Sequence, residues 1–239
     1  MNTTRKNKFQ TVLAASLLAA GLCLAATTAN AVPISVSASI GGVPTGTSYE
    51  NFDSLTLGGA GGATASGITV SFSPDGGAVQ GALANKYAAP FLSSNNGTLF
   101  GDLNNGADGT TYLTSGLGDA TLTFATGEKY LGLLWGSVDQ ENTLSFYDGA
   151  TLVGSIAGSD VTALANGDQG ANGTFYVNIN SPVAFDRVVA TSTKYSFEFD
   201  NVAFDTGSVA VPEPGTIGMF LLGLALVGSG YWLRKRKPA

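Results

Sequence analysis

The chain has 239 residues, of which 11 are Lys or Arg and 17 are Asp or Glu; it contains no histidine and one cysteine, Cys23. The missing histidine excludes Ser-His-Asp and Cys-His catalytic sets, and a single cysteine leaves too few ligands for zinc, copper or haem iron. Between residues 32 and 210, four cations stand against sixteen acids. A segment this acidic is not expected to bind nucleic acid, which requires neutralisation of phosphates.

Residues 1–31 have the pattern of a secretory signal peptide. Three cations within the first eight residues precede a mostly apolar stretch at 9–26. Ala29 and Ala31 form the small-x-small pattern that a signal peptidase cleaves, so the mature chain is expected to begin at Val32. The secretion machinery and signal peptidase are therefore predicted partners, and Cys23 is lost with the signal.

The segment 32–208 is long enough for one domain, and its pattern predicts strands. Short alternating, β-branched or aromatic stretches are separated by turn residues. Asp148-Gly149 predicts a hairpin, and Thr126-Gly127-Glu128 predicts a second turn. We expect an all-β fold, an antiparallel β-sandwich of jelly-roll type. The expected strands are 34–40, 68–73, 120–125, 130–135, 143–147, 151–156, 174–179, 183–191 and 195–204.

The longest region without a clear strand pattern is 74–119, which is dense in Gly, Asn and Asp. Within it, residues 102–109 first suggest a calcium loop. The segment departs from the EF-hand pattern, because Gly106 stands where a ligand belongs and no glutamate occupies the twelfth position. We therefore expect a Gly/Asn loop here.

Acidic residues near the two ends of the domain predict a different calcium site. Asp200, followed by Asn201, interrupts the last apolar strand, and Asp53 follows the first strands. In a jelly roll the first and last strands are often neighbours. Carboxylates from both could then join backbone carbonyls around Ca²⁺, which prefers oxygen ligands. The alternative, a structural role for Asp200 at the end of a pairing or in a turn, stays open.

Two further patterns bear on carbohydrate chemistry. Asp139 and Glu141 are two residues apart, so on a strand they would share a face, as a glycoside-acting enzyme requires of its paired carboxylates. They follow an apolar strand, where a polar turn is the simpler interpretation. Trp135 and Tyr147 could stack on sugar rings in a carbohydrate-binding module, but Trp135 lies in an apolar strand typical of a core.

The last thirty-one residues, 209–239, have three parts in a fixed order. An extended, proline-flanked segment precedes an uncharged apolar run at 217–233, and a basic tail at 234–237 follows. An apolar run of about 17 residues reaches the lower limit for a transmembrane helix, and the cations after it stop transfer and stay in the cytoplasm. The extended segment comprises Val211, Pro212, Glu213 and Pro214, and the basic tail comprises Arg234, Lys235, Arg236 and Lys237.

This arrangement resembles the PEP-CTERM sorting signal of exosortase-dependent surface proteins. The resemblance implies that an exosortase-type transpeptidase in the inner membrane cuts near Pro212–Pro214. It also implies a precursor whose body lies in the periplasm of a Gram-negative bacterium before it reaches the cell surface or the medium. Residues 130–139, 142–147 and 197–204 are similar to one group of these proteins, which implies an extracellular sandwich without established chemistry.

From these patterns we expect a surface or extracellular-matrix protein, associated with exopolysaccharide, that has no enzymatic activity. It requires no cofactor apart from the calcium ion considered above. A carbohydrate-binding module and a glycoside-acting enzyme are the alternatives.

Overall fold

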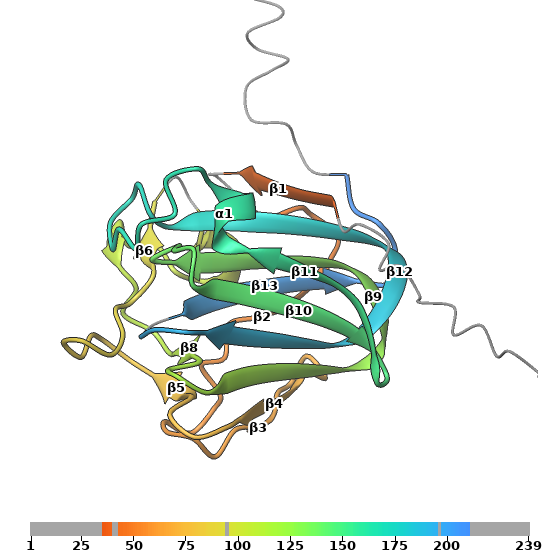
Figure 1. The fold of residues 1–239 in the computed structure, drawn as a ribbon, viewed down its shortest axis with the longest axis horizontal. Helices are drawn as coiled ribbons and strands as arrows, with labels where there is room; N and C mark the ends of the chain where they lie inside the picture. The colour runs from red at the N-terminus through yellow and green to blue at the C-terminus, as the bar shows by residue number, and fades with distance from the viewer. Residues whose placement is uncertain (1–34, 40–42, 94–95, 196, 211–239) are drawn as a thin grey trace, which may run out of the picture. The chain divides into compact units, whose positions relative to one another are not determined.

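The computed structural model describes residues 35–39, 43–93, 96–195 and 197–210, with the backbone alone for 35–39 (Figure 1). These residues form a body of antiparallel strands, 11 of which join into one sheet, while β6 and β7 pair separately. The predicted all-β architecture is confirmed. The strands are β1 (Ser35–Ser39), β2 (Ser48–Glu50), β3 (Gly62–Ala63), β4 (Thr69–Phe72), β5 (Gly77–Val79), β6 (Phe91–Leu92), β7 (Gly106–Ala107), β8 (Tyr112–Thr114), β9 (Asp119–Gly136), β10 (Asn142–Asp148), β11 (Thr151–Ala157), β12 (Phe175–Ser192) and β13 (Glu198–Asp205).

The two longest strands, β9 and β12, each have 18 residues and serve both layers of the body (Figure 1). Their mutual pairing is interrupted between Asn180 and Phe185 of β12 and then resumes. On one side of the interruption their outer neighbours are β1 and β13, and on the other side they are β4 and β10. Strands that pass from one layer to the other at a bulge or bend form the corners of a sandwich.

One turn predicted from the sequence is part of a strand in the structure. Thr126-Gly127-Glu128, expected to be a turn between two strands, lies inside the continuous strand β9. The chain does not reverse there, because Glu128 continues the strand and pairs with Phe185 of β12, with a register shift on each side of this pair. The close approach at the bend suits glycine, since a Cβ on Gly127 would lie 3.2 Å from the Ala184 Cβ. By contrast, the hairpin predicted at Asp148-Gly149 is confirmed between β10 and β11.

Aromatic side chains close the two layers over one core. The ring of Phe124, on β9, lies 5.3 Å from that of Phe204 on β13 and 5.8 Å from that of Phe185 on β12. The ring of Phe146, on β10, lies 5.1 Å from that of Phe185. Burying one such side chain contributes about 1.5–3 kcal/mol. The core between the layers is therefore a main source of stability.

The layer that contains β13 is buried on both faces. In the apolar run 130–135, Trp135 enters the main core, whereas the neighbouring Leu134 points into a second cluster on the opposite face. Leu92 of β6 belongs to this second cluster, and Phe100 packs against it. The segment around β6 and β7 therefore covers the outer face of β9 and β13.

The region 74–119, whose sequence has no clear strand pattern, contains four short strands. Strands β5 and β8 pair with each other, and β8 extends the sheet beyond β13. Strands β6 and β7 form a separate two-residue ladder. The short helix η1 (Thr98–Phe100) lies between them along the chain. Strands of two or three residues are too short to show a period of two in the sequence. This region supplies the cover over the outer face of β13.

The predicted signal peptide and the predicted transmembrane helix at 217–233 lie outside the described residues. Within the described ranges, the helix α1 (Gly158–Val161) has four residues, and no helix is both long and apolar enough to span a membrane.

Candidate metal centre

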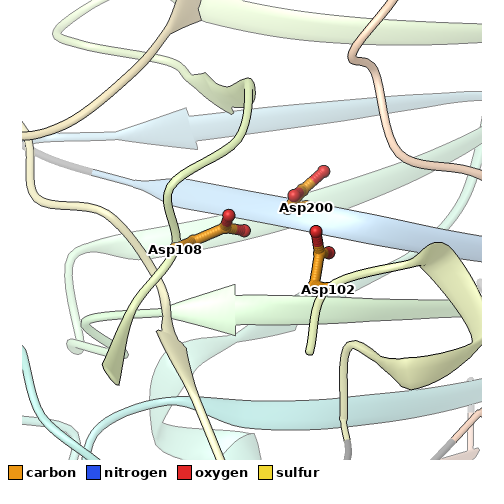
Figure 2. A group of neighbouring side chains, drawn as sticks. All are labelled: Asp102, Asp108 and Asp200. Carbon is orange, nitrogen blue, oxygen red and sulfur yellow. The ribbon is translucent and has the colours of Figure 1, made fainter. Parts of the chain in front are cut away.

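Three carboxylates from separate parts of the chain meet at the outer face of β13. They belong to Asp102, Asp108 and Asp200, and one oxygen from each lies within 4.8 Å of the others. Asp200 lies on β13, Asp102 lies between η1 and β7, and Asp108 directly follows β7. Figure 2 shows the carboxylates of Asp102 and Asp108 turned toward Asp200.

A β-bulge in β13 directs Asp200 and Asn201 to this site. Asp200 pairs with Leu134 and Ala203 pairs with Gly132, so β13 contains one extra residue at this point. Asn201 has a φ of 52°, in the left-handed region. Bulges re-aim side chains that would otherwise alternate between faces. Here Asn201 donates a hydrogen bond from Nδ2 to the Oδ2 of Asp102 at 2.9 Å, on the side where Asp200 meets the acids.

Backbone hydrogen bonds hold the other two aspartates in place. The N–H of Asp102 donates to the carbonyl of Gly97 at 3.0 Å, and the N–H of Asp108 donates to the carbonyl of Pro90 at 2.8 Å. The Oδ1 of Asp108 also accepts a hydrogen bond from the N–H of Thr110 at 2.8 Å. A Cβ on Gly97 would lie 2.6 Å from the Asp102 Cβ, so this turn requires glycine.

The cluster is buried and acidic. Asp200 is 0 % exposed, Asp108 is 2 % exposed and Asp102 is 9 % exposed. Burial raises the pKa of Asp200 well above its ordinary value, and the charge of Asp108 adds to this effect. Burial likewise raises the pKa of Asp102, while the hydrogen bond from Asn201 opposes the rise. The carboxyl groups of Asp200 and Asp102 therefore resist ionisation unless a positive charge joins them.

Protein donors leave much of the cluster unsatisfied. Among the residues that the structure describes, none donates a hydrogen bond of normal geometry to either oxygen of Asp200, although the N–H of Asn201 is close enough to lower its pKa somewhat. The buried Oδ2 of Asp108 and the Oδ1 of Asn201 likewise have no donor in the described part of the chain. In the part of the chain that the structure describes, the ion pairs are Lys86–Asp75 and Lys194–Glu141, and neither involves the cluster.

Such a set of groups matches the chemistry of a hard divalent cation. Its candidate ligands are oxygens alone, from three carboxylates, and oxygen ligands are those that Ca²⁺ and Mg²⁺ prefer. The same atoms could instead share protons, since the carboxylates of Asp108 and Asp200 are close enough for a hydrogen bond when one is protonated. The site can therefore exist with bound protons or with a bound cation.

Of the two predicted calcium ligands, the structure places Asp200 in the cluster and Asp53 beside it. The Oδ1 of Asp53 accepts a hydrogen bond from the N–H of Thr111 at 2.9 Å, and its Oδ2 accepts one from the Nδ2 of Asn51 at 2.7 Å. Its charge contributes to the raised pKa of Asp102, so it is near the cluster without being one of the three. The first strand, β1, pairs with β12, whereas β2, which precedes Asp53, pairs with the last strand β13.

The sequence predicts a loop at Asp102 and Asp108, and their approach to Asp200 was not predicted. They do lie outside regular strands, but the ladder between β6 and β7 brings them over β13. The available signal was the acidic, Gly- and Asn-rich composition of the loop together with an unexplained Asp-Asn pair in an apolar strand. Neither pattern alone indicates the contact, which joins residues about a hundred positions apart.

The acids considered for glycoside chemistry have local partners. The Oδ1 of Asp139 accepts hydrogen bonds from the N–H groups of Glu141 and Asn142, at 2.9 and 3.1 Å. Glu141 is paired with Lys194. Both acids line a pocket of about 380 Å³ with polar neighbours that include Gln169. The hydrogen bonds match the polar turn that the sequence favoured at this position.

Each aromatic residue considered for sugar stacking has another side chain over its ring. Trp135 is 0 % exposed and stacks on Phe197 with the ring centres 4.4 Å apart, so it belongs to the core. The ring of Tyr147 has the guanidinium of Arg187 over its face, 4.1 Å from the ring centre. These two residues therefore do not form an open aromatic surface.

The predicted cleavage and sorting residues lie outside the described residues: Ala29, Ala31, Val211, Pro212, Glu213, Pro214, Arg234, Lys235, Arg236 and Lys237. For the C-terminal part, comparison with protein families supplies the evidence. The family model described as PEP-CTERM protein-sorting motif matches residues 210–237, which confirms the resemblance seen in the sequence. No curated protein and no solved structure matches the chain. The motif implies a secreted precursor that crosses the membrane, is processed by exosortase, a transpeptidase, and reaches the cell surface.

Proposed function

We propose that this exosortase-targeted protein supplies a non-catalytic β-sandwich to the extracellular matrix, where it associates with exopolysaccharide. In the proposed sequence of events, signal peptidase cuts after Ala31 and the body folds in the periplasm. The apolar run at 217–233 holds the precursor in the inner membrane until exosortase cuts near Pro212–Pro214. The observation that carries this proposal is the sorting motif at 210–237.

Several properties of the body support a structural role. The paired acids Asp139 and Glu141 are engaged in a turn and an ion pair, and Trp135 is buried in the core. The segment 32–210 is strongly acidic, which favours solubility outside the cell and disfavours binding to other polyanions. A charged sandwich of this kind suits a component of the extracellular matrix.

Replacing Pro212, Glu213 and Pro214 with Ala tests the sorting step in cells that make the protein. The apolar run and basic tail still insert, but the transpeptidase loses its recognition segment, so we expect the body to remain in the membrane fraction. The matched control is Thr206→Ala/Ser208→Ala, which changes two exposed residues just before the motif. Fractionation followed by immunoblotting measures the distribution. Release of the triple variant at the level of the control would contradict the proposal.

A further inference from the structure

We propose that Asp102, Asp108 and Asp200 bind one calcium ion, which fastens the loop around η1 and β7 to the last strand. The inference rests on the geometry of the body and does not depend on the exosortase processing proposed above.

The buried environment of Asp200 is the first observation that supports a bound ion. Its side chain is 0 % exposed, and no described residue gives either oxygen a hydrogen bond of normal geometry. An ionised carboxylate removed from water without a partner costs several kcal/mol. A donor-free Asp108 oxygen and the Asp102 carboxylate lie beside it. A single shared proton can form a hydrogen bond between only two of these carboxylates, whereas a divalent cation can be bound by all three.

The chemistry favours calcium over other cations. The three carboxylate oxygens lie within 4.8 Å of one another, close enough to share one cation. Mg²⁺ usually keeps several waters when it binds to a protein. A buried all-protein set of oxygens fits the larger and more easily dehydrated ion.

The ion would act as a cross-link between parts of the chain that share few regular hydrogen bonds. Asp102 and Asp108 flank the two-residue strand β7, whose ladder with β6 is too short to be stable alone. Asp200 belongs to β13, which pairs with β2, β8 and β9. Binding to both therefore anchors a weakly paired segment to the centre of the sheet.

Equilibrium dialysis of the full chain, purified in mild detergent, against radioactive Ca²⁺ tests the proposal directly. We expect one ion per chain, with a Kd within the range of about 10⁻⁴ to 10⁻³ M found for extracellular calcium modules. Asp200→Asn and Asp108→Asn keep the shape of each side chain and remove one charged ligand, and we expect each to weaken binding at least about tenfold. Circular dichroism checks that both variants fold.

The matched control is Asp148→Asn, which removes an exposed carboxylate at the β10–β11 hairpin. Asn-Gly is a favoured hairpin turn, so this variant should keep the fold and the calcium affinity of the wild type. No binding by the wild type at about 10 mM Ca²⁺, roughly ten times the weak end of the expected range, would overturn the proposal. Equal affinity of folded Asp200→Asn and wild type, or equal affinity for Mg²⁺, would overturn it as well.

A second readout distinguishes the cation from a shared proton. Binding of Ca²⁺ to a protonated cluster must displace the proton from the carboxyl oxygen into the solvent, so the calcium affinity should rise with pH. Calorimetric titration in two buffers with different ionisation enthalpies should show proton release on binding. Affinity that stays constant with pH, with no proton released, would contradict a site centred on the buried Asp200.

Discussion

Replacing Asp200 with Asn should make the calcium-free protein increasingly stable relative to the wild type as the pH rises. Burial and then the neighbouring Asp108 raise the pKa of Asp200 well above its ordinary value. The folded chain therefore keeps this proton at pH values where the unfolded chain has lost it. Because the folded state binds the extra proton, wild-type stability falls as the pH rises from about 4, the pKa of an unfolded aspartate, to the raised pKa.

The size of the effect follows from proton counting. One proton held only by the folded state changes the free energy of unfolding by about 1.4 kcal/mol per pH unit. The amide of Asp200→Asn does not titrate, so this contribution disappears. Asp102 and Glu128 also have pKa values raised by burial, but they are present in both proteins and largely cancel in the comparison. In a domain of this size, each kcal/mol corresponds to about 2–4 °C in Tm.

Urea unfolding of the full chain in chelator-treated buffers, from about pH 5 to about pH 8, measures the two stabilities by circular dichroism. We expect the gap between variant and wild type to widen by up to about 1.4 kcal/mol per pH unit, and to stop widening once the raised pKa is passed. The control Asp148→Asn should follow the wild type. Parallel curves for wild type and Asp200→Asn would refute the reasoning, because Asp200 would then titrate alike in the folded and unfolded chains.

Two further predictions concern packing. Gly97→Ala should destabilise the body by about 1–3 kcal/mol and weaken calcium binding, because the new Cβ would lie 2.6 Å from the Asp102 Cβ. In the control Gly109→Ala the new Cβ meets no atom within 4 Å, so this variant should do neither. Equal unfolding curves for the two variants would contradict this prediction. Phe197→Ala should cost about 3–5 kcal/mol through loss of its stacking on Trp135, measured by urea unfolding. A loss below about 1 kcal/mol would show that the stacked pair is not part of the core.

The strands were predictable wherever the apolar pattern extended over enough residues to be recognised in the sequence. Residues 130–135 indicated a central strand because both of their faces are buried, one in each apolar cluster. The union of 120–125 and 130–135 into β9 was not predictable. Gly127 resembles a turn residue, and only the pairing of Glu128 with Phe185 of β12 shows that the strand continues. Strands β6 and β7 were missed because two residues carry no periodic signal.

The candidate site was predictable only in part, for a related reason. Asp200 and Asn201 were noticed because two polar residues interrupt an apolar strand, and the structure accounts for them by a bulge. Their partners Asp102 and Asp108 come from a segment whose sequence specifies only a loop. The ladder of β6 with β7 and the packing of Phe100 on the outer face of the sheet determine where that loop lies. Such long-range placement leaves no local trace in the sequence.

The intact mass of the protein released into the medium tests the central functional claim most directly. The proposed processing predicts a chain that begins at Val32 and ends near Pro212–Pro214, because signal peptidase removes 1–31 and exosortase removes the apolar run and basic tail. A released protein whose mass still includes residues 217–237 would contradict the account, since the sorting motif would then not direct cleavage.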